Sequence, residues 1–200
     1  VAAAATNLNK PEQSMLLDLL KEYEDLFDGT LGKWETPPVK IELKPGSTPV
    51  SARWYPVPRI NKETFKKKLE RLVLIGVLEV VQESEYGTPV FIIPKKEGTV
   101  RFITDFRKIN SQIVRKPYPI PRIADTLQQM EGFTYATALD LNMGYYTIRL
   151  APGSKDLTTI VTKFGKYRYN VLPMGMCVSG DIFQAKVYEL LGDINGVKCY

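Results

Sequence analysis

Residues 87–110 read GTPVFIIPKKEGTVRFITDFRKIN, and this stretch decides how the chain is expected to fold. Two runs rich in β-branched and aromatic residues, 89–93 and 100–105, flank the loop PKKEG at 94–98. Apolar runs separated by a short glycine-containing loop are typical of antiparallel strands in a hairpin. The sequence therefore predicts a β-hairpin with a basic tip.

Helical periodicity occurs on both sides of this hairpin. Apolar residues recur at three- and four-residue steps in 11–27, 62–75 and 179–191, which predicts amphipathic helices. A shorter helix is expected over 122–130. In the last long helix, the residues expected to face inward are Ile182, Phe183, Val187, Leu190 and Leu191.

Further short strands are expected elsewhere along the chain. They lie at residues 39–44, 78–81, 134–141, 145–150, 158–162, 167–172 and 197–200, where 134–141 and 145–150 could each be a strand or a strand with a turn. Short helices and hairpins follow one another without regular alternation. This pattern favours an α+β fold.

Composition excludes several classes of protein. With 200 residues and 44% hydrophobic content, the chain can bury a core, yet it has no apolar run long enough to span a membrane. Histidine is absent, which excludes His-based metal sites and Ser-His-Asp triads. Two cysteines cannot build a disulfide framework, so a reducing compartment, cytoplasm or nucleus, is expected.

The basic residues are clustered. The net charge of +5 alone is compatible with an ordinary solvated surface. The clusters are Lys62, Lys66, Lys67, Lys68 and Arg71; Lys95, Lys96, Arg101, Arg107 and Lys108; and Arg115, Lys116 and Arg122. Clustering of this kind suits contacts with phosphates, so nucleic acid is the expected partner.

Three segments in the second half of the chain carry the candidate chemistry. They are ALDLNMGYY at 138–146, LPMG at 172–175 and DIFQ at 181–184. Taken alone, Asp140 in the first segment reads as a strand-end residue that caps a turn. Together with 87–96, 100–110 and YPIP at 118–121, however, these segments resemble in order and spacing the reverse transcriptases of gypsy-like LTR retrotransposons.

The resemblance implies a domain organisation. Residues 1–10 would be a disordered tail or a remnant of cloning, and 11–60 a connector with one helix and one extended strand. Residues 61–135 would be the fingers of a right-hand polymerase, and 136–200 part of its palm with some fingers elements.

The resemblance also implies roles for individual residues. Asp140 would be a catalytic residue and a ligand of magnesium, because nucleotidyl transfer needs two divalent cations. The residues expected to bind the dNTP are Lys95, Lys96, Arg101, Tyr145, Met174 and Gly175, with Tyr145 beneath the deoxyribose. Arg107, Arg115 and Lys116 would bind the template-primer, although Asp105 and Arg107 could equally form a structural ion pair.

The sequence departs from the family pattern at two places. Ser179-Gly180 stands where the family has Ala/Ser-Pro. The family's third catalytic segment continues as Tyr-x-Asp-Asp, whereas the printed sequence ends on Tyr200. The parent enzyme would copy RNA or DNA into DNA with Mg2+, but the chain by itself is expected to bind no stable magnesium and to be inactive.

Whether the chain itself is an enzyme stays open in the sequence. It could be a piece of a larger polymerase, a repurposed remnant that binds nucleic acid or a protein, or a plain interaction module. An incomplete palm sheet would leave an exposed edge near 138–141, so self-association is expected. No membrane partner is expected.

Overall fold

The computed structural model describes residues 1–96, 98–130 and 132–199. The chain divides into two compact units, Val1–Gly32 and Lys33–Tyr200. The boundary after Gly32 falls inside the expected connector 11–60, so residues 33–60 belong to the second unit.

The first unit is built around helix α1 (Lys10–Glu22), between the 3-10 helices η1 (Ala2–Ala4) and η2 (Glu24–Leu26). Asn9 and Glu12 cap α1 reciprocally, because each side chain accepts the other's backbone N–H, at 3.0 and 2.8 Å. The helix predicted over 11–27 ends earlier than expected, at Glu22. No residue of α1 or η2 is buried, so no packing extends the helix further.

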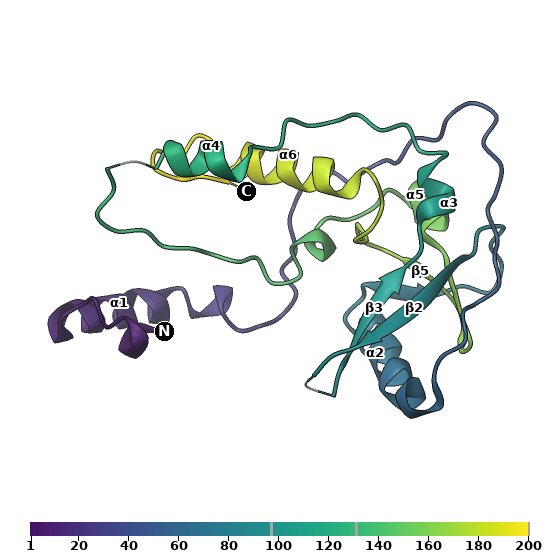
Figure 1. Cartoon of the computed structure of the whole chain (residues 1–200), viewed down its shortest axis with the longest axis horizontal. Coiled ribbons are helices and arrows are strands. Elements are labelled where there is room, and N and C mark those ends of the chain that lie inside the picture. Colours follow the sequence, from purple (N-terminus) through teal and green to yellow (C-terminus); the bar gives the residue numbers. More distant parts are fainter. Residues whose placement is uncertain (97, 131, 200) are drawn as a thin grey trace. The chain divides into compact units, whose positions relative to one another are not determined.

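The second unit contains a five-stranded sheet in the order β1-β5-β4-β2-β3 (Figure 1). The strands are β1 (Leu78–Val80), β2 (Thr88–Pro94), β3 (Val100–Thr104), β4 (Ile160–Thr162) and β5 (Gly165–Tyr169). Strands β2 and β4 are parallel, and the other neighbours are antiparallel. Both predicted hairpins form, with Ile93 opposite Arg101 in one and Val161 opposite Lys166 in the other.

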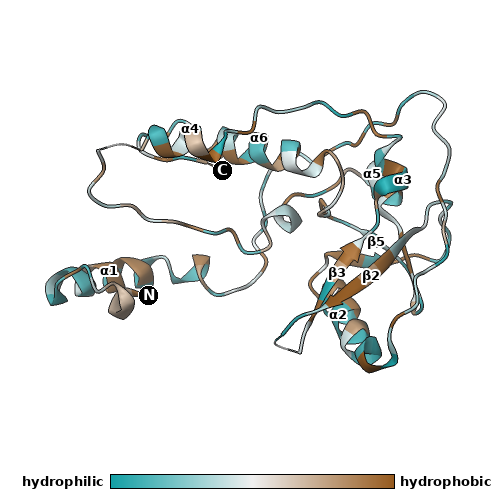
Figure 2. Ribbon diagram, viewed as in Figure 1, coloured by the Kyte–Doolittle hydropathy of each residue, from teal (hydrophilic) through white to brown (hydrophobic). Residues whose placement is uncertain are grey.

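The second unit also contains helices and 3-10 turns. They are η3 (Arg59–Asn61), α2 (Lys62–Leu74), α3 (Arg107–Asn110), α4 (Ile123–Gln128), η4 (Gly144–Thr147), α5 (Pro152–Lys155), η5 (Asp156–Thr158) and α6 (Ser179–Leu191). Figure 2 shows apolar residues concentrated on β2 and β3, whereas α2 alternates between apolar and polar turns. The predicted helices 62–75, 122–130 and 179–191 are thus confirmed, the second in shortened form.

The core lies between α2 and the sheet. The Phe65 ring of α2 lies 5.8 Å from Phe102 and 5.9 Å from Phe164. Tyr169 is fully buried, and its hydroxyl lies 3.2 Å from the Thr104 hydroxyl. This burial raises the pKa of Tyr169 well above its ordinary value.

Two strand predictions are wrong, and a third, 145–150, is wrong in its first half. Residues 134–141 are irregular, as are 197–199, while Tyr200 lies outside the described residues. Residues 144–147 form the helix η4 instead of a strand, whereas Arg149 and Leu150 are extended and make isolated bridges to Val171 and Val39. A strand requires a hydrogen-bonded neighbour, and segments 134–141 and 197–199, although apolar in pattern, find no partner strand among the described residues.

Two further predictions need correction. Residues 39–44 are extended and alternate in burial as expected, but they make only isolated bridges, Val39 to Leu150 and Leu43 to Ile113. In α6 the buried face is Ser179, Asp181, Gln184 and Val187, while Leu190 is exposed. Asp181 and Gln184 tolerate burial because both are hydrogen-bonded.

Candidate nucleotide and nucleic-acid site

The loop that follows Leu172 has an unusual backbone at Gly175. Its φ angle is +96°, which side-chain-bearing residues rarely adopt. A Cβ there would lie 3.6 Å from the Phe106 ring and from the Thr104 carbonyl, an ordinary contact distance. Glycine is therefore required by backbone conformation rather than by lack of room. Next to it, the Met174 side chain is 50% exposed.

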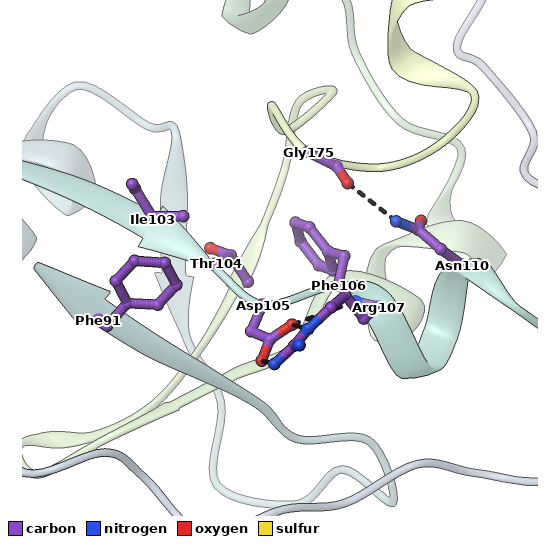
Figure 3. Close-up of a pocket in the computed structure, with 8 residues that line it drawn as sticks. All are labelled: Phe91, Ile103, Thr104, Asp105, Phe106, Arg107, Asn110 and Gly175. Atoms are coloured by element: carbon purple, nitrogen blue, oxygen red, sulfur yellow. Dashed lines mark hydrogen bonds and ion pairs between the residues drawn. The ribbon is translucent and has the colours of Figure 1, made fainter.

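Asn110, the last residue of α3, holds this loop. Its amide nitrogen donates to the Gly175 carbonyl at 3.0 Å (Figure 3). Its amide oxygen accepts from the Cys177 N–H at 2.9 Å. The hydroxyl of Ser179 donates to the Pro173 carbonyl at 2.6 Å. Both ends of the loop are thus tied to structured elements, which fixes how Gly175 is presented.

An open pocket of about 420 Å³ lies against this loop. It is lined by Phe91, Ile103, Thr104, Asp105, Phe106, Arg107, Asn110 and Gly175 (Figure 3). Two of the residues selected from the sequence, Arg107 and Gly175, meet here although 68 positions separate them (175 − 107).

Asp105 and Arg107 form a bidentate ion pair at the base of the β2–β3 hairpin. The Arg107 Nε and Nη2 atoms each lie 2.7 Å from an oxygen of Asp105, and the Tyr55 hydroxyl donates to the same carboxylate at 2.9 Å. Hydrogen bonding from Arg107 holds the pKa of Asp105 well below its ordinary value. The Arg107 side chain is 85% exposed, so the paired guanidinium still faces solvent.

A second hollow of about 720 Å³ shares this ion pair with the pocket. It is lined by Val50, Ala52, Arg53, Tyr55, Thr88, Pro89, Asp105, Arg107, Lys108 and Ser111. The guanidinium of Arg107 therefore lies beside two concave surfaces, and basic residues border the larger one.

Lys95, Lys96 and Arg101 are exposed on the β2–β3 hairpin. The turn is closed by the Lys95 N–H, which donates to the Thr99 carbonyl at 2.8 Å. Glu97, inside the predicted loop, lies outside the described residues. The hairpin thus gathers three cations at its outer end, as its sequence suggests.

Tyr145 lies in η4 and stacks on α6. Its ring is 4.8 Å from the Phe183 ring, with an interplanar angle of 26°. Phe183 also meets Trp34 edge-on at 6.5 Å. A Cβ on Gly144 would come within 2.8 Å of the Phe183 ring, so glycine allows this close approach. Phe183 therefore sets the position of Tyr145.

Asp140 lies in the exposed irregular segment before η4. Within the described ranges, no three His, Cys, Asp or Glu residues come together as a group that could hold a metal ion. A pair of magnesium ions needs several carboxylate oxygens besides those of substrate phosphates. The described residues by themselves therefore do not fit a two-metal site.

Arg115 and Lys116 are engaged within the chain. Arg115 binds Asp181 through Nε at 2.7 Å and Nη2 at 3.2 Å, and the Tyr118 N–H donates to the same carboxylate at 3.1 Å. These bonds lower the pKa of Asp181, Arg115 being the main cause. Lys116 pairs with Glu42 at 2.9 Å. Both cations thus have internal partners in addition to their exposure to solvent.

Sequence reasoning missed the residues that position the site. Asn110 was visible as the end of the motif 100–110, and a side chain with both donor and acceptor suits a loop clamp. Nothing local marked Tyr55 as a partner of Asp105, or Asp181 as the partner of Arg115.

Comparison with known proteins shows which family the chain belongs to. Residues 93–200, more than half of the chain, match the family "Reverse transcriptase (RNA-dependent DNA polymerase)". The chain is 30% identical over 195 residues to the retrovirus-related Pol polyprotein from transposon opus of Drosophila melanogaster, covering 94% of this chain and 19% of that polyprotein.

Two solved structures share the fold. The crystal structure of the Prototype Foamy Virus protease-reverse transcriptase CSH mutant superposes with a TM-score of 0.89 and 27% identity, over 100% of this chain and 27% of that one. The foamy viral protease-reverse transcriptase in complex with dsDNA gives 0.80 and 25%, over 97% and 39%.

The fold and the motifs define the polymerase domain of a right-hand nucleic-acid polymerase. Among such polymerases, the chain belongs to the reverse transcriptase family, and retrotransposon polyproteins are among its relatives. It spans less than a fifth of the opus polyprotein and well under half of the two solved chains. No helix in the described part of the chain is long and apolar enough to cross a membrane.

Proposed function

We propose that this chain is the fingers and the beginning of the palm of a reverse transcriptase from a gypsy-like retrotransposon polyprotein. The parent activity is RNA- and DNA-templated DNA synthesis. The observation that carries the proposal is the Asn110 clamp, which fixes the Gly175 loop beside the pocket bordered by Arg107.

In this proposal the incoming dNTP lies between the hairpin and the loop. Lys95, Lys96 and Arg101 neutralise the triphosphate, since point-charge lysines and a forked arginine suit polyphosphate. Met174 and Gly175 contact the nucleotide. Tyr145, supported by the Phe183 ring at 4.8 Å, forms a flat floor beneath the deoxyribose that disfavours a ribose 2′-hydroxyl.

The template-primer contacts Arg107, Arg115 and Lys116. Each of these cations has an intrachain carboxylate partner, so its orientation is already fixed before a phosphate arrives. Preorganised cations lose less conformational freedom on binding. Side-chain exposure of 85% for Arg107 and 54% for Arg115 leaves room for a phosphate oxygen.

Asp140 is the proposed ligand of catalytic magnesium, which would activate the primer hydroxyl when bound. One carboxylate does not hold two ions, so the 200 residues alone bind nucleic acid without catalysing DNA synthesis. Exposed apolar side chains around Asp140, Leu139 and Leu141 among them, favour self-association of the isolated chain.

The test is a binding titration of a labelled duplex and a labelled single strand over a salt series. If roughly three phosphates are neutralised, log K falls against log salt with a slope of about −2 to −3. Arg107→Met should reduce the size of that slope by about 1. Lys21→Met, which removes the same charge from the first unit, should leave it unchanged. Absence of binding at low salt would refute the proposal.

A further inference from the structure

Seven cations from three separate elements gather around helix α2. We call them the α2 basic face: Lys62, Lys66, Lys67, Lys68 and Arg71 of α2, Lys95 of the β2–β3 turn and Lys163 of the β4–β5 turn. All but Lys62 and Lys68 are exposed, and those two are half-buried.

The hydrophobic core brings these elements together. Phe65 of α2 packs against Phe102 of β3 and against Phe164, the residue after Lys163. The Phe65 side chain thus packs α2 against both hairpins, and Figure 1 shows the helix next to β3. The lysines of the two turns consequently flank the helix.

The flanking cations lie close enough to repel each other. The pKa of Lys163 is lowered, with Lys62 as the main cause. Partial burial lowers the pKa of Lys68, and Arg71 and Lys95 lower it further. Like charges held together by a fold raise its free energy, and a polyanion removes that repulsion when it binds.

Within the described part of the chain, carboxylates do not neutralise this face. Helix α2 carries two acidic residues, Glu63 and Glu70, against five basic ones. Glu70 pairs with Lys66 at 3.7 Å, and both side chains are more than half exposed, so the pair adds little stability.

Between residues 63 and 71, the outer surface of α2 lacks the apolar centre that protein partners use. Its exposed residues there are Glu63, Lys66, Lys67, Glu70 and Arg71, all of them charged, and the exposed Leu74 lies at the end of the helix. Protein–protein interfaces bury apolar and aromatic residues at their centre, whereas nucleic-acid contacts are polar and strongly positive. At 13 residues the helix is about 20 Å long, enough to follow several phosphates.

We propose that the α2 basic face is a second nucleic-acid-binding surface, which holds a strand by its phosphates outside the pocket beside Gly175. The proposal rests on the proposed function, because it assumes that this domain meets nucleic acid. It adds a location on the fingers and a mode of binding that is independent of base sequence.

The test uses the whole 200-residue chain with three substitutions, Lys62→Gln, Lys67→Gln and Lys163→Gln. The matched control removes three lysines elsewhere, Lys10→Gln, Lys21→Gln and Lys198→Gln. Duplex and single-stranded oligonucleotides are titrated over a salt series, with polyglutamate as a competitor of equal charge.

We expect the variant of the α2 basic face to bind the oligonucleotides at least tenfold more weakly at low salt. The slope of log K against log salt should become smaller in size by about 1 to 2, while the control variant keeps the affinity and the slope of the unsubstituted chain. The thermal unfolding midpoint of the first variant should not fall, because the substitutions relieve repulsion and remove no core contact. This second measurement separates loss of binding from loss of fold.

Other outcomes overturn the inference in distinguishable ways. Equal weakening in both variants would show that only net charge matters, and equal competition by polyglutamate would show a general polyanion surface. If the first variant binds as tightly as the unsubstituted chain, this surface is excluded while the proposed function stands. If the unsubstituted chain binds no nucleic acid at low salt, both fail together.

Discussion

Removal of the Arg115 charge should destabilise the second unit more than removal of any exposed charge nearby. Arg115 binds the carboxylate of Asp181, whose side chain is only 3% exposed, in the first turn of α6. In Arg115→Met that carboxylate loses both hydrogen bonds from the guanidinium and keeps the one from the Tyr118 N–H at 3.1 Å. A buried carboxylate without its cation is expensive because it has lost most of its hydration.

The expected loss of unfolding free energy in Arg115→Met follows from the burial of Arg115 and Asp181. Removing one partner of a fully buried pair costs about 3–5 kcal/mol. Because Arg115 is 54% exposed, water partly screens this pair, and we expect about 2–3 kcal/mol. For a domain of this size, that corresponds to a fall in unfolding midpoint of about 5–10 °C. Asp181→Asn keeps an acceptor for Tyr118 and should cost less, about 1–2 kcal/mol.

The pH dependence gives an independent check. The pKa of Asp181 is lowered in the folded chain, so its contribution to stability is fully present above its unfolded pKa, about 3.9. That contribution is lost as the pH falls through the lowered folded pKa. The stability gap between the unsubstituted chain and Asp181→Asn should therefore be constant near neutral pH and narrow below about pH 4.

Thermal and urea unfolding followed by circular dichroism measure these differences. The matched control is Lys116→Met, because Lys116 pairs with Glu42 on the surface. This substitution should lower the free energy of unfolding by no more than about 0.5 kcal/mol. If Lys116→Met destabilised the chain as much as Arg115→Met, burial of the carboxylate would not be the cause. A gap that widened in acid would also contradict the reasoning.

Three further predictions concern catalysis, packing and association. The isolated 200 residues should not extend an annealed primer with dNTPs and magnesium; template-dependent extension that Asp140→Asn abolishes would contradict this. Phe183→Leu removes the ring that meets Trp34 at 6.5 Å, so tryptophan emission should shift to the red and stability should fall by about 1–2 kcal/mol; unchanged emission would argue against this packing. Leu139→Lys should reduce self-association in light scattering, whereas Leu74→Lys, at an equally exposed leucine, should not; identical scattering would remove the segment around Leu139 as the contact.

Local pattern was enough to predict much of the fold. The two hairpins and helices α2 and α6 were predicted close to their observed bounds, because strand alternation, helical period and turn glycines act over a few residues. The ordered motifs likewise identified the family, which the match over residues 93–200 confirms. The roles assigned to individual residues remain predictions.

Contacts between distant segments could not be predicted in this way. The carboxylates that hold Arg115 and Lys116 are 66 and 74 residues away in the sequence. Residues 134–141 have the pattern of a strand, but a strand depends on a neighbour that its own sequence does not specify. The sequence by itself thus determined the two hairpins, the helices α2 and α6, and the family to which the chain belongs. The tertiary structure alone decided that Asn110 clamps the Gly175 loop and that Asp181 holds Arg115, because hydrogen bonds across such separations depend on how the packed core places the two backbones.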